Sequence, residues 1–154
     1  MSLPAFDGRG NLPPGIYWTD WATLEKRFGQ SPHRRRLLEG LRTALLELKA
    51  VGCRTVYIDG SFVTTKEKPG DFDGCWDPEG VDFDRLAGSV LLNFENQRAA
   101  QKSRFRGEMF LSNTRADAAG ALFLDFFQKD QDGYPKGIVA LDLRSYHDQE
   151  RTPI

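Results

Sequence analysis

Cysteine and histidine are scarce in this sequence of 154 residues. The two cysteines, Cys53 and Cys75, are too few for a disulfide framework or a closed zinc site. The two histidines, His33 and His147, exclude a metal site built from several histidines. We therefore expect both cysteines to be small apolar residues on or beside core strands, where free cysteines usually lie.

Long apolar runs and an excess of one charge are also missing. No hydrophobic stretch approaches the ~20 residues that span a bilayer. The first residues lack the apolar segment of a secretory signal, so we expect a cytoplasmic protein without membrane contact. The formal net charge of −1 argues against a surface that is basic throughout, although it allows a local basic patch. With 40% hydrophobic and 28% charged residues, the composition is that of a globular chain.

The length indicates a single domain over residues 1–154. Residues 1–16 are rich in glycine and proline, and we expect them to form an entry segment. Residues 145–154 are expected to be a mobile tail. No internal repeat and no linker divides the chain.

Hydrophobic periodicity predicts helices that alternate with strands. One helix is expected at 20–28, with Asp20 as its N-cap, and a longer one at 31–50, with Ser31 as its N-cap. Shorter helices are expected at 83–92 and 117–129, and residues 97–106 are expected to form either a helix or a loop. Strands are expected at 54–59, 71–76, 107–112 and 138–143. The alternation predicts a mixed α/β (α+β) fold, in which helices pack against a small mixed β-sheet. The side chains expected in its core include Trp18, Trp21, Trp76, Phe123, Phe126 and Phe127, with stacking of one of these rings on a nucleotide base as the alternative.

The most informative stretch joins two short motifs. An apolar run ends in Gly60-Ser61, where the glycine lets the backbone approach an anion and the serine adds a hydroxyl donor. A polar loop then leads to Asp71-Phe72-Asp73. If residues 71–76 form a strand, Asp71 and Asp73 share one face, with Cα atoms roughly 6–7 Å apart, close enough to hold one cluster of divalent cations. A phosphate-binding loop beside a divalent-cation site is the minimum that nucleotidyl or phosphoryl transfer needs.

The same tripeptide recurs as Asp82-Phe83-Asp84 and serves as an internal control. Because this copy precedes an apolar helical stripe, its carboxylates are explained as a helix cap and first-turn charges. For the first copy, an EF-hand is excluded because Cys75 and Trp76 stand where that loop needs an acidic or amide ligand and a glycine. The first copy therefore takes its meaning from its spacing after Gly60-Ser61.

This pattern resembles the signature of the nucleotidyltransferase superfamily that includes DNA polymerase beta. That signature is an apolar strand, Gly-Ser, a spacer and two acids that flank an apolar residue. Ile58, Gly60-Ser61, the spacer 62–70 and Asp71-Phe72-Asp73 carry this likeness. A wider set of segments is similar to an uncharacterised bacterial family of small stand-alone nucleotidyltransferase-like proteins: Leu12–Ile16, the arginine-rich start of the long helix, Asp59–Thr64, Phe126–Gln128 and Lys136–Val139.

The resemblance implies transfer of a nucleoside monophosphate from an NTP such as ATP to a protein or RNA acceptor, with Mg²⁺ or Mn²⁺ as cofactor. It implies a toxin–antitoxin or phage-defence module as the setting. Asp71 and Asp73 would be catalytic and hold the metal, with Glu108 as the third carboxylate and Asp142 as its alternative. Gly60 and Ser61 would cradle the phosphates. The alternative functions are a catalytically silent binding module that neutralises a partner protein, and a structural domain with a fortuitous acidic pair.

Several cations are further candidates for phosphate contact. Lys66 and Lys68 lie in the spacer, and Lys136 precedes Gly137. For all three lysines the favoured interpretation is a solvated loop. Arg34-Arg35-Arg36 begins the long helix, where cations oppose the helix dipole. We expect a solvated face there, with contact to a partner or to nucleic-acid phosphate as the alternative.

Overall fold

The structure, a computed structural model, describes residues 2–146. Its five strands form one sheet in the order β1-β5-β2-β3-β4. The strands are β1 (Gly15–Thr19), β2 (Thr55–Asp59), β3 (Phe72–Trp76), β4 (Gly107–Leu111) and β5 (Gly137–Asp142). β1 runs parallel to β5 and β4 runs parallel to β3, whereas β2 is antiparallel to both of its neighbours. The predicted mixed α/β class is confirmed.

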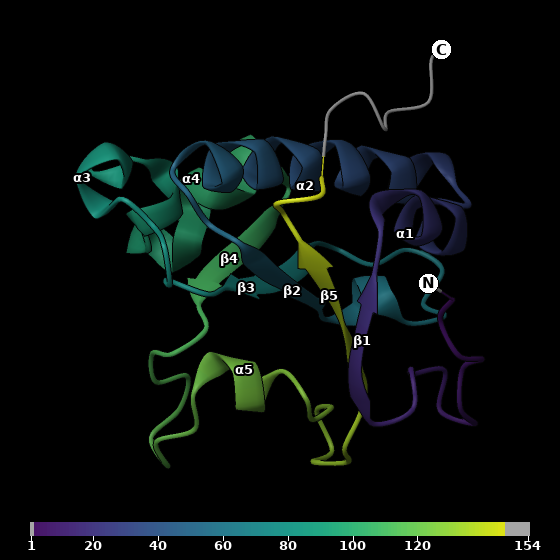
Figure 1. The fold of residues 1–154 in the computed structure, drawn as a ribbon. Coiled ribbons are helices and arrows are strands. Elements are labelled where there is room, and N and C mark those ends of the chain that lie inside the picture. Colours follow the sequence, from purple (N-terminus) through teal and green to yellow (C-terminus); the bar gives the residue numbers. More distant parts are fainter. Residues whose placement is uncertain (1, 147–154) are drawn as a thin grey trace.

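The long helices are α1 (Trp21–Phe28), α2 (Pro32–Ala50) and α4 (Glu95–Phe105), and α2 runs across the strands on one side of the sheet (Figure 1). The predicted caps are confirmed, because Asp20 accepts a hydrogen bond from the Thr23 backbone N–H and Ser31 accepts one from that of Arg34. Residues 97–106, for which the sequence allowed a helix or a loop, lie almost entirely within α4.

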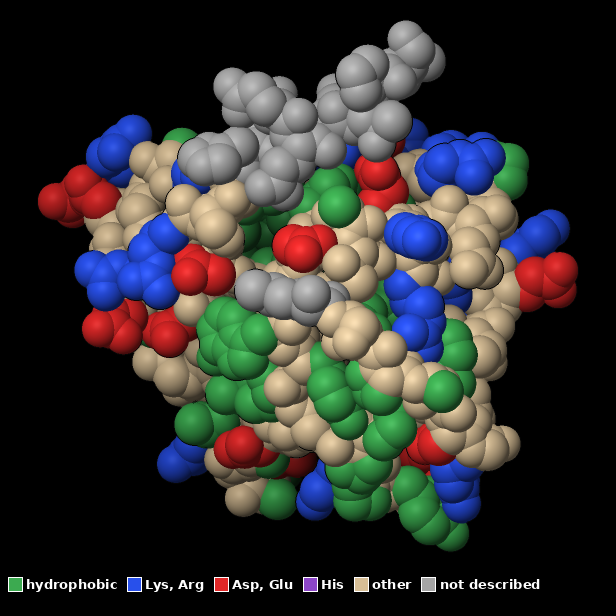
Figure 2. All heavy atoms as spheres, turned by 45° about the vertical axis from the view of Figure 1, so that its right-hand side comes forward, with side chains coloured by type: hydrophobic (Ala, Val, Ile, Leu, Met, Phe, Trp, Pro, Cys, Tyr) green, Lys and Arg blue, Asp and Glu red, His purple; other side chains and the backbone are tan. Residues whose placement is uncertain are grey.

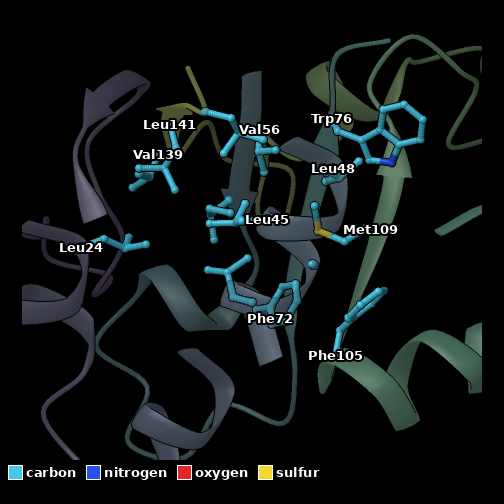
Figure 3. Packing of buried hydrophobic residues seen from close by; sticks show 14 of the residues in the cluster. Leu24, Leu45, Leu48, Val56, Phe72, Trp76, Phe105, Met109, Val139 and Leu141 are labelled. Carbon is cyan, nitrogen blue, oxygen red and sulfur yellow. The ribbon is translucent and has the colours of Figure 1, made fainter. Parts of the chain in front are cut away.

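The hydrophobic core lies between the sheet and these helices. Figure 3 shows Leu45 and Leu48 together with Val56, Phe72 and Met109 in one cluster of buried side chains. Because side chains alternate along a strand, the residues between these core positions point to the opposite face of the sheet. That opposite face is therefore available for polar side chains.

Strand β1 is an element that the sequence did not predict. Its first two residues fall within the expected entry segment, and the strand lies at the edge of the sheet. Ile16 and Trp18 on this edge are 39% and 49% exposed, so the prediction that Trp18 belongs to the core is wrong, whereas Trp21 and Trp76 are fully buried. Hydrophobic side chains also gather on the face shown in Figure 2, which brings the β1 side of the molecule forward.

Two predicted helices are much shorter in the structure. The first divides into α3 (Phe83–Leu86) and the 3-10 turn η2 (Val90–Leu92), with Gly88 at φ 81° between them. The second is reduced to α5 (Phe123–Phe126), preceded by Gly120 at φ 89°. Each glycine takes a left-handed backbone, which interrupts the longer helix that the sequence predicts. α5 contains no buried residue and Phe127, which follows it, is only half-buried, so the prediction that Phe123, Phe126 and Phe127 pack in the core is wrong.

Both cysteines are free and buried, as predicted. At the end of the described chain Tyr146 is 4% exposed, and its ring centroid lies 5.6 Å from that of Trp21, so the tail does not begin at residue 145. The rest of the predicted tail, residues 147–154, lies outside the described residues. Within residues 2–146 no helix is long and apolar enough to cross a membrane.

Candidate functional site

Three carboxylates form a row across neighbouring strands on the sheet face opposite the core. Asp59 of β2 lies in register with Asp73 of β3, and Asp73 lies in register with Glu108 of β4. Residues directly opposite each other point to the same face, and adjacent strands are only ~4.8 Å apart. We call these three residues the acidic row. Like charges at this spacing repel, so the row needs protons or cations to be stable.

Asp73 and Glu108 share a hydrogen bond and titrate as a coupled pair. Burial raises the pKa of Asp73 to about 8, and the hydrogen bond and the charge of Glu108 raise it too. Burial alone would also raise the pKa of Glu108, but the hydrogen bond with Asp73 and the contact with Arg98 lower it overall. Of the two acids, Asp73 therefore holds a proton more strongly than Glu108. Arg98 Nη2 and Lys102 Nζ lie 2.9 and 3.3 Å from Glu108 Oε1.

Asp59 is balanced by a lysine. Lys136 Nζ lies 3.0 Å from Asp59 Oδ1, and the two residues are only 8% and 3% exposed. Burial raises the pKa of Asp59 to about 6, although the Lys136 ammonium acts to lower it. The solvated loop favoured for Lys136 is therefore wrong. The role of Asp59 was also missed, because an aspartate before a glycine is usually explained by the turn.

Gly60 is needed where the loop after β2 meets the acidic row. Its backbone has φ 81°, and a Cβ atom built there would lie 2.4 Å from Asp73 Oδ2. Any larger side chain would both strain the backbone and displace that carboxyl group. Ser61 follows directly and begins the 3-10 turn η1 (Ser61–Val63). The Gly60 backbone therefore lies against the central carboxyl group, and Ser61 lines the same cavity.

Arg34 fixes the loop that follows this motif. Its guanidinium donates to four backbone carbonyls, those of Phe28, Phe62, Thr64 and Lys66, at 2.6–3.3 Å. The residue is 6% exposed, so the solvated face expected for all three arginines is wrong for Arg34, while Arg35 and Arg36 are exposed. A guanidinium offers five donors in a rigid fork, which suits a residue that ties several carbonyls together. No pattern within Arg34-Arg35-Arg36 distinguishes the first arginine from its neighbours.

α4 positions the other end of the row. Gln101 is fully buried, where its Oε1 accepts from the Met109 backbone N–H at 2.7 Å and its Nε2 donates to the Leu91 carbonyl at 3.3 Å. One turn earlier Arg98, which pairs with Glu108, has a left-handed backbone with φ 63°. Such a conformation costs about 1–2 kcal/mol in a non-glycine residue. The contacts of Gln101 and Arg98 therefore hold a locally unfavourable helix start beside Glu108.

The acidic row lines a cavity of about 800 Å³. Gly60 and Ser61 also line it, together with Lys66 from the spacer. Lys68 is exposed outside this lining. The rest of the wall includes polar side chains such as Arg9 and Asp130, and the four rings of Phe110, Phe123, Phe126 and Phe127. A cavity of this size holds a small organic ligand such as a nucleotide.

Asp71 and Asp142 lie apart from this cavity. β3 begins at Phe72, one residue later than predicted, so Asp71 lies just before the strand and lines a separate hollow of about 210 Å³ beside Arg36 and Lys102. Asp142 lies opposite Thr55, at the other end of β2 from Asp59, and is paired with Arg144 at 3.0 Å. The structure thus brings Glu108, and not Asp142, beside Asp73.

The donor set fits a divalent cation in part. Asp73 and Glu108 offer adjacent carboxylate oxygens, the ligand type that Mg²⁺ prefers, and a cation bound there would relieve the repulsion between them. Asp71, the expected partner of Asp73, lines the other hollow. Within residues 2–146 no group of three or more Asp, Glu, His or Cys side chains is placed to hold one metal ion.

The comparisons with known proteins give a family without a function. No curated protein and no solved structure matches the chain. One family model matches residues 4–142, a range that includes all five strands and every residue that lines the large cavity. Its description is a family of unknown function, DUF6932. The chain belongs to this family.

Proposed function

We propose that the protein is a nucleotidyltransferase, which moves a nucleoside monophosphate from an NTP to a hydroxyl group of a protein or RNA acceptor. The observation that carries the proposal is the acidic row beside Gly60-Ser61 in one cavity. The acids differ from the predicted pair, because Asp73 is adjacent to Glu108 and Asp59 and not to Asp71. The resemblance to the nucleotidyltransferase superfamily supports the same assignment.

The residues of this chain would divide the work between binding and proton transfer. Gly60 and Ser61 would bind the phosphates through the backbone and hydroxyl, while Lys66 and Lys136 would neutralise them. Asp73 and Glu108 would hold Mg²⁺ or Mn²⁺, which supplies charge neutralisation when it is bound. The acceptor oxygen would bond to the α-phosphorus as the bond to the leaving pyrophosphate breaks. The acceptor proton would pass to an oxygen of the Asp73–Glu108 pair.

Label transfer tests this proposal directly. The chain is incubated with each α-³²P NTP, Mg²⁺ or Mn²⁺, and protein and RNA acceptors. We expect the native chain to transfer label, and Asp73→Asn and Glu108→Gln each to lose at least about 100-fold of the rate, because each removes a carboxylate that the reaction uses. Asp84→Asn, a change in the second copy of the tripeptide, should keep the native rate. Native rates in both carboxylate variants would contradict the proposal.

One observation favours the alternative, a catalytically silent module that binds a partner protein. Glu108 is already neutralised by Arg98 and Lys102, so part of the acidic row is occupied by the chain's own cations. In that case the native chain would transfer no label with any NTP or acceptor, and a partner would be retained equally by the native chain and by Glu108→Gln. Transfer by the native chain excludes this alternative.

A further inference from the structure

The connection between β4 and β5, residues 112–136, carries an aromatic cluster that the core does not use. In Figure 1 its helix α5 lies well away from α1 and α2, beyond the strands. No residue of α5 is buried, and Phe126 is 42% exposed. Exposed aromatic rings of this kind lose the stabilisation that burial would give them. A cluster placed outside the core therefore needs another explanation.

The rings are ordered with respect to one another. Phe110 and Phe123 stack with centroids 4.2 Å apart and planes 9° apart, and Phe127 lies 5.6 Å from Phe123. Phe126 meets Phe127 edge to face at 6.0 Å and 76°. Phe110 is two residues after Glu108 on β4, so it points to the same sheet face as the acidic row. These four phenylalanines, which we call the aromatic wall, all line the large cavity.

The cavity therefore has two chemically different parts. One part contains the acidic row, Gly60-Ser61 and Lys136, and the other contains the aromatic wall. A ligand that uses both parts needs a charged group and a flat, apolar face within one small molecule. Aromatic rings attract flat π-systems through stacked and edge-to-face contacts. An aliphatic chain would bury apolar area against the rings, but it would leave the charged part without a partner.

We propose that the aromatic wall is the base subsite of the cavity, in which Phe126 stacks on the heterocyclic base of a nucleotide whose phosphates lie at Gly60-Ser61. This proposal rests on the proposed function in one respect, which is that the ligand is a nucleotide. Phe126 is chosen because it is the most exposed ring of the wall, whereas Phe110 is already stacked on Phe123. Stacking favours larger ring systems, so ATP and GTP should depend on Phe126 more than CTP and UTP do.

Calorimetric titration of the native chain with ATP, adenosine and inorganic tripolyphosphate, each with Mg²⁺, separates the two parts of the cavity. Removing one stacking ring costs about 5- to 150-fold in affinity. We expect Phe126→Ala to lose this factor for ATP and adenosine and to keep tripolyphosphate binding within about twofold. Phe126→Tyr, which keeps the ring, should restore the affinity. Phe83→Ala is the matched control, because Phe83 is 44% exposed but lies outside the lining of the cavity.

Four outcomes would overturn the subsite. Phe126→Ala could keep its affinity for ATP and adenosine, or lose as much affinity for tripolyphosphate as for ATP. The native chain could bind neither ATP nor adenosine, or Phe126→Ala could change the oligomeric mass in place of the affinity. The last would indicate that the wall pairs with a second copy of the chain. The label-transfer assay keeps the two proposals separate. If label is transferred at the native rate by Phe126→Ala, only the base subsite is contradicted. If adenosine binding depends on Phe126 but no label is transferred, only the nucleotidyltransferase proposal is contradicted.

Discussion

The two copies of Asp-Phe-Asp have the same local sequence and opposite structural roles. In the first, Phe72 is fully buried in the core and Asp73 faces the cavity in register with two other acids. In the second, Phe83 is 44% exposed and Asp82 caps α3 by accepting from the backbone N–H groups of Asp84 and Arg85. The tripeptide carries no function by itself. Its role depends on which strands or turns pack around it.

The largest contrast should come from the central phenylalanines. Phe72→Ala empties a fully buried site against which Gly107 packs, since a Cβ on that glycine would lie 2.4 Å from the Phe72 ring. We expect it to lower the free energy of unfolding by about 3–5 kcal/mol. Phe83→Ala should cost about 1 kcal/mol or less, because much of that ring is already in water. Urea denaturation of both variants measures the difference, and equal losses would contradict the comparison.

The residues that follow the two copies give the next contrast. A Cβ on Gly74 would lie 2.8 Å from the Tyr57 carbonyl oxygen and 2.9 Å from Met109 Sδ. Gly74→Ala should therefore cost about 2–3 kcal/mol by crowding the sheet. Arg85, the equivalent residue in the second copy, is exposed on α3, and Arg85→Ala should be close to neutral. Thermal unfolding of the pair tests this, and a neutral Gly74→Ala would show that the sheet adjusts freely.

The third contrast depends on pH. The pKa of Asp73 is raised by burial from 3.8 to about 8, so folding is penalised progressively as pH rises through this range. Asp73→Asn removes the ionisable group and should stabilise the fold by roughly 1–3 kcal/mol at pH 8–9, with the gain disappearing toward pH 4. Asp84→Asn, at an exposed position, should show no such trend. A gain that does not vary with pH would argue against a buried proton at Asp73.

The smallest contrast concerns the first aspartates. Asp82→Ala removes an N-cap and should cost about 1 kcal/mol, with faster amide hydrogen exchange at Asp84 and Arg85. Asp71→Ala leaves no cap unsatisfied, but it removes a negative charge near Lys102 in the small hollow. Its effect should be a few tenths of a kcal/mol and should shrink with added salt. A salt-independent loss of 1 kcal/mol at Asp71 would place that residue in a structural role.

Elements with strong local signals were predictable. α1 and α2 follow an apolar stripe of helical period and begin at Asp20 and Ser31, so their bounds agree closely with the prediction. The strands that contribute Asp59, Asp73 and Glu108 were also predicted, within one or two residues at each end. β1 was missed because it begins within the glycine- and proline-rich entry segment, and because Ile16, Tyr17 and Trp18 follow one another without the polar alternation of a strand. α5 was overestimated because aromatic residues that line a cavity give the same apolar pattern as core residues.

The site was predictable in part for the same reason. Gly60-Ser61, Asp73 and Glu108 were chosen from motifs and strand order, and they line one cavity. Lys136 and Arg34 were not distinguishable from solvated cations, because their partners lie far away in the sequence. Lys136 pairs with Asp59, and Arg34 donates to carbonyls between residues 28 and 66. Contacts of this kind leave no local spacing to detect.

By itself the sequence determined the class of the fold, the two long helices and the neighbourhood of Gly60-Ser61 and Asp71-Phe72-Asp73, because helix caps, apolar periodicity and glycine act over a few residues. Only the tertiary structure decided which acids meet. The register of β2, β3 and β4 places Asp59 and Glu108 on either side of Asp73, while the start of β3 leaves Asp71 in another hollow. Strand register is set by packing between distant segments, so no tripeptide specifies it.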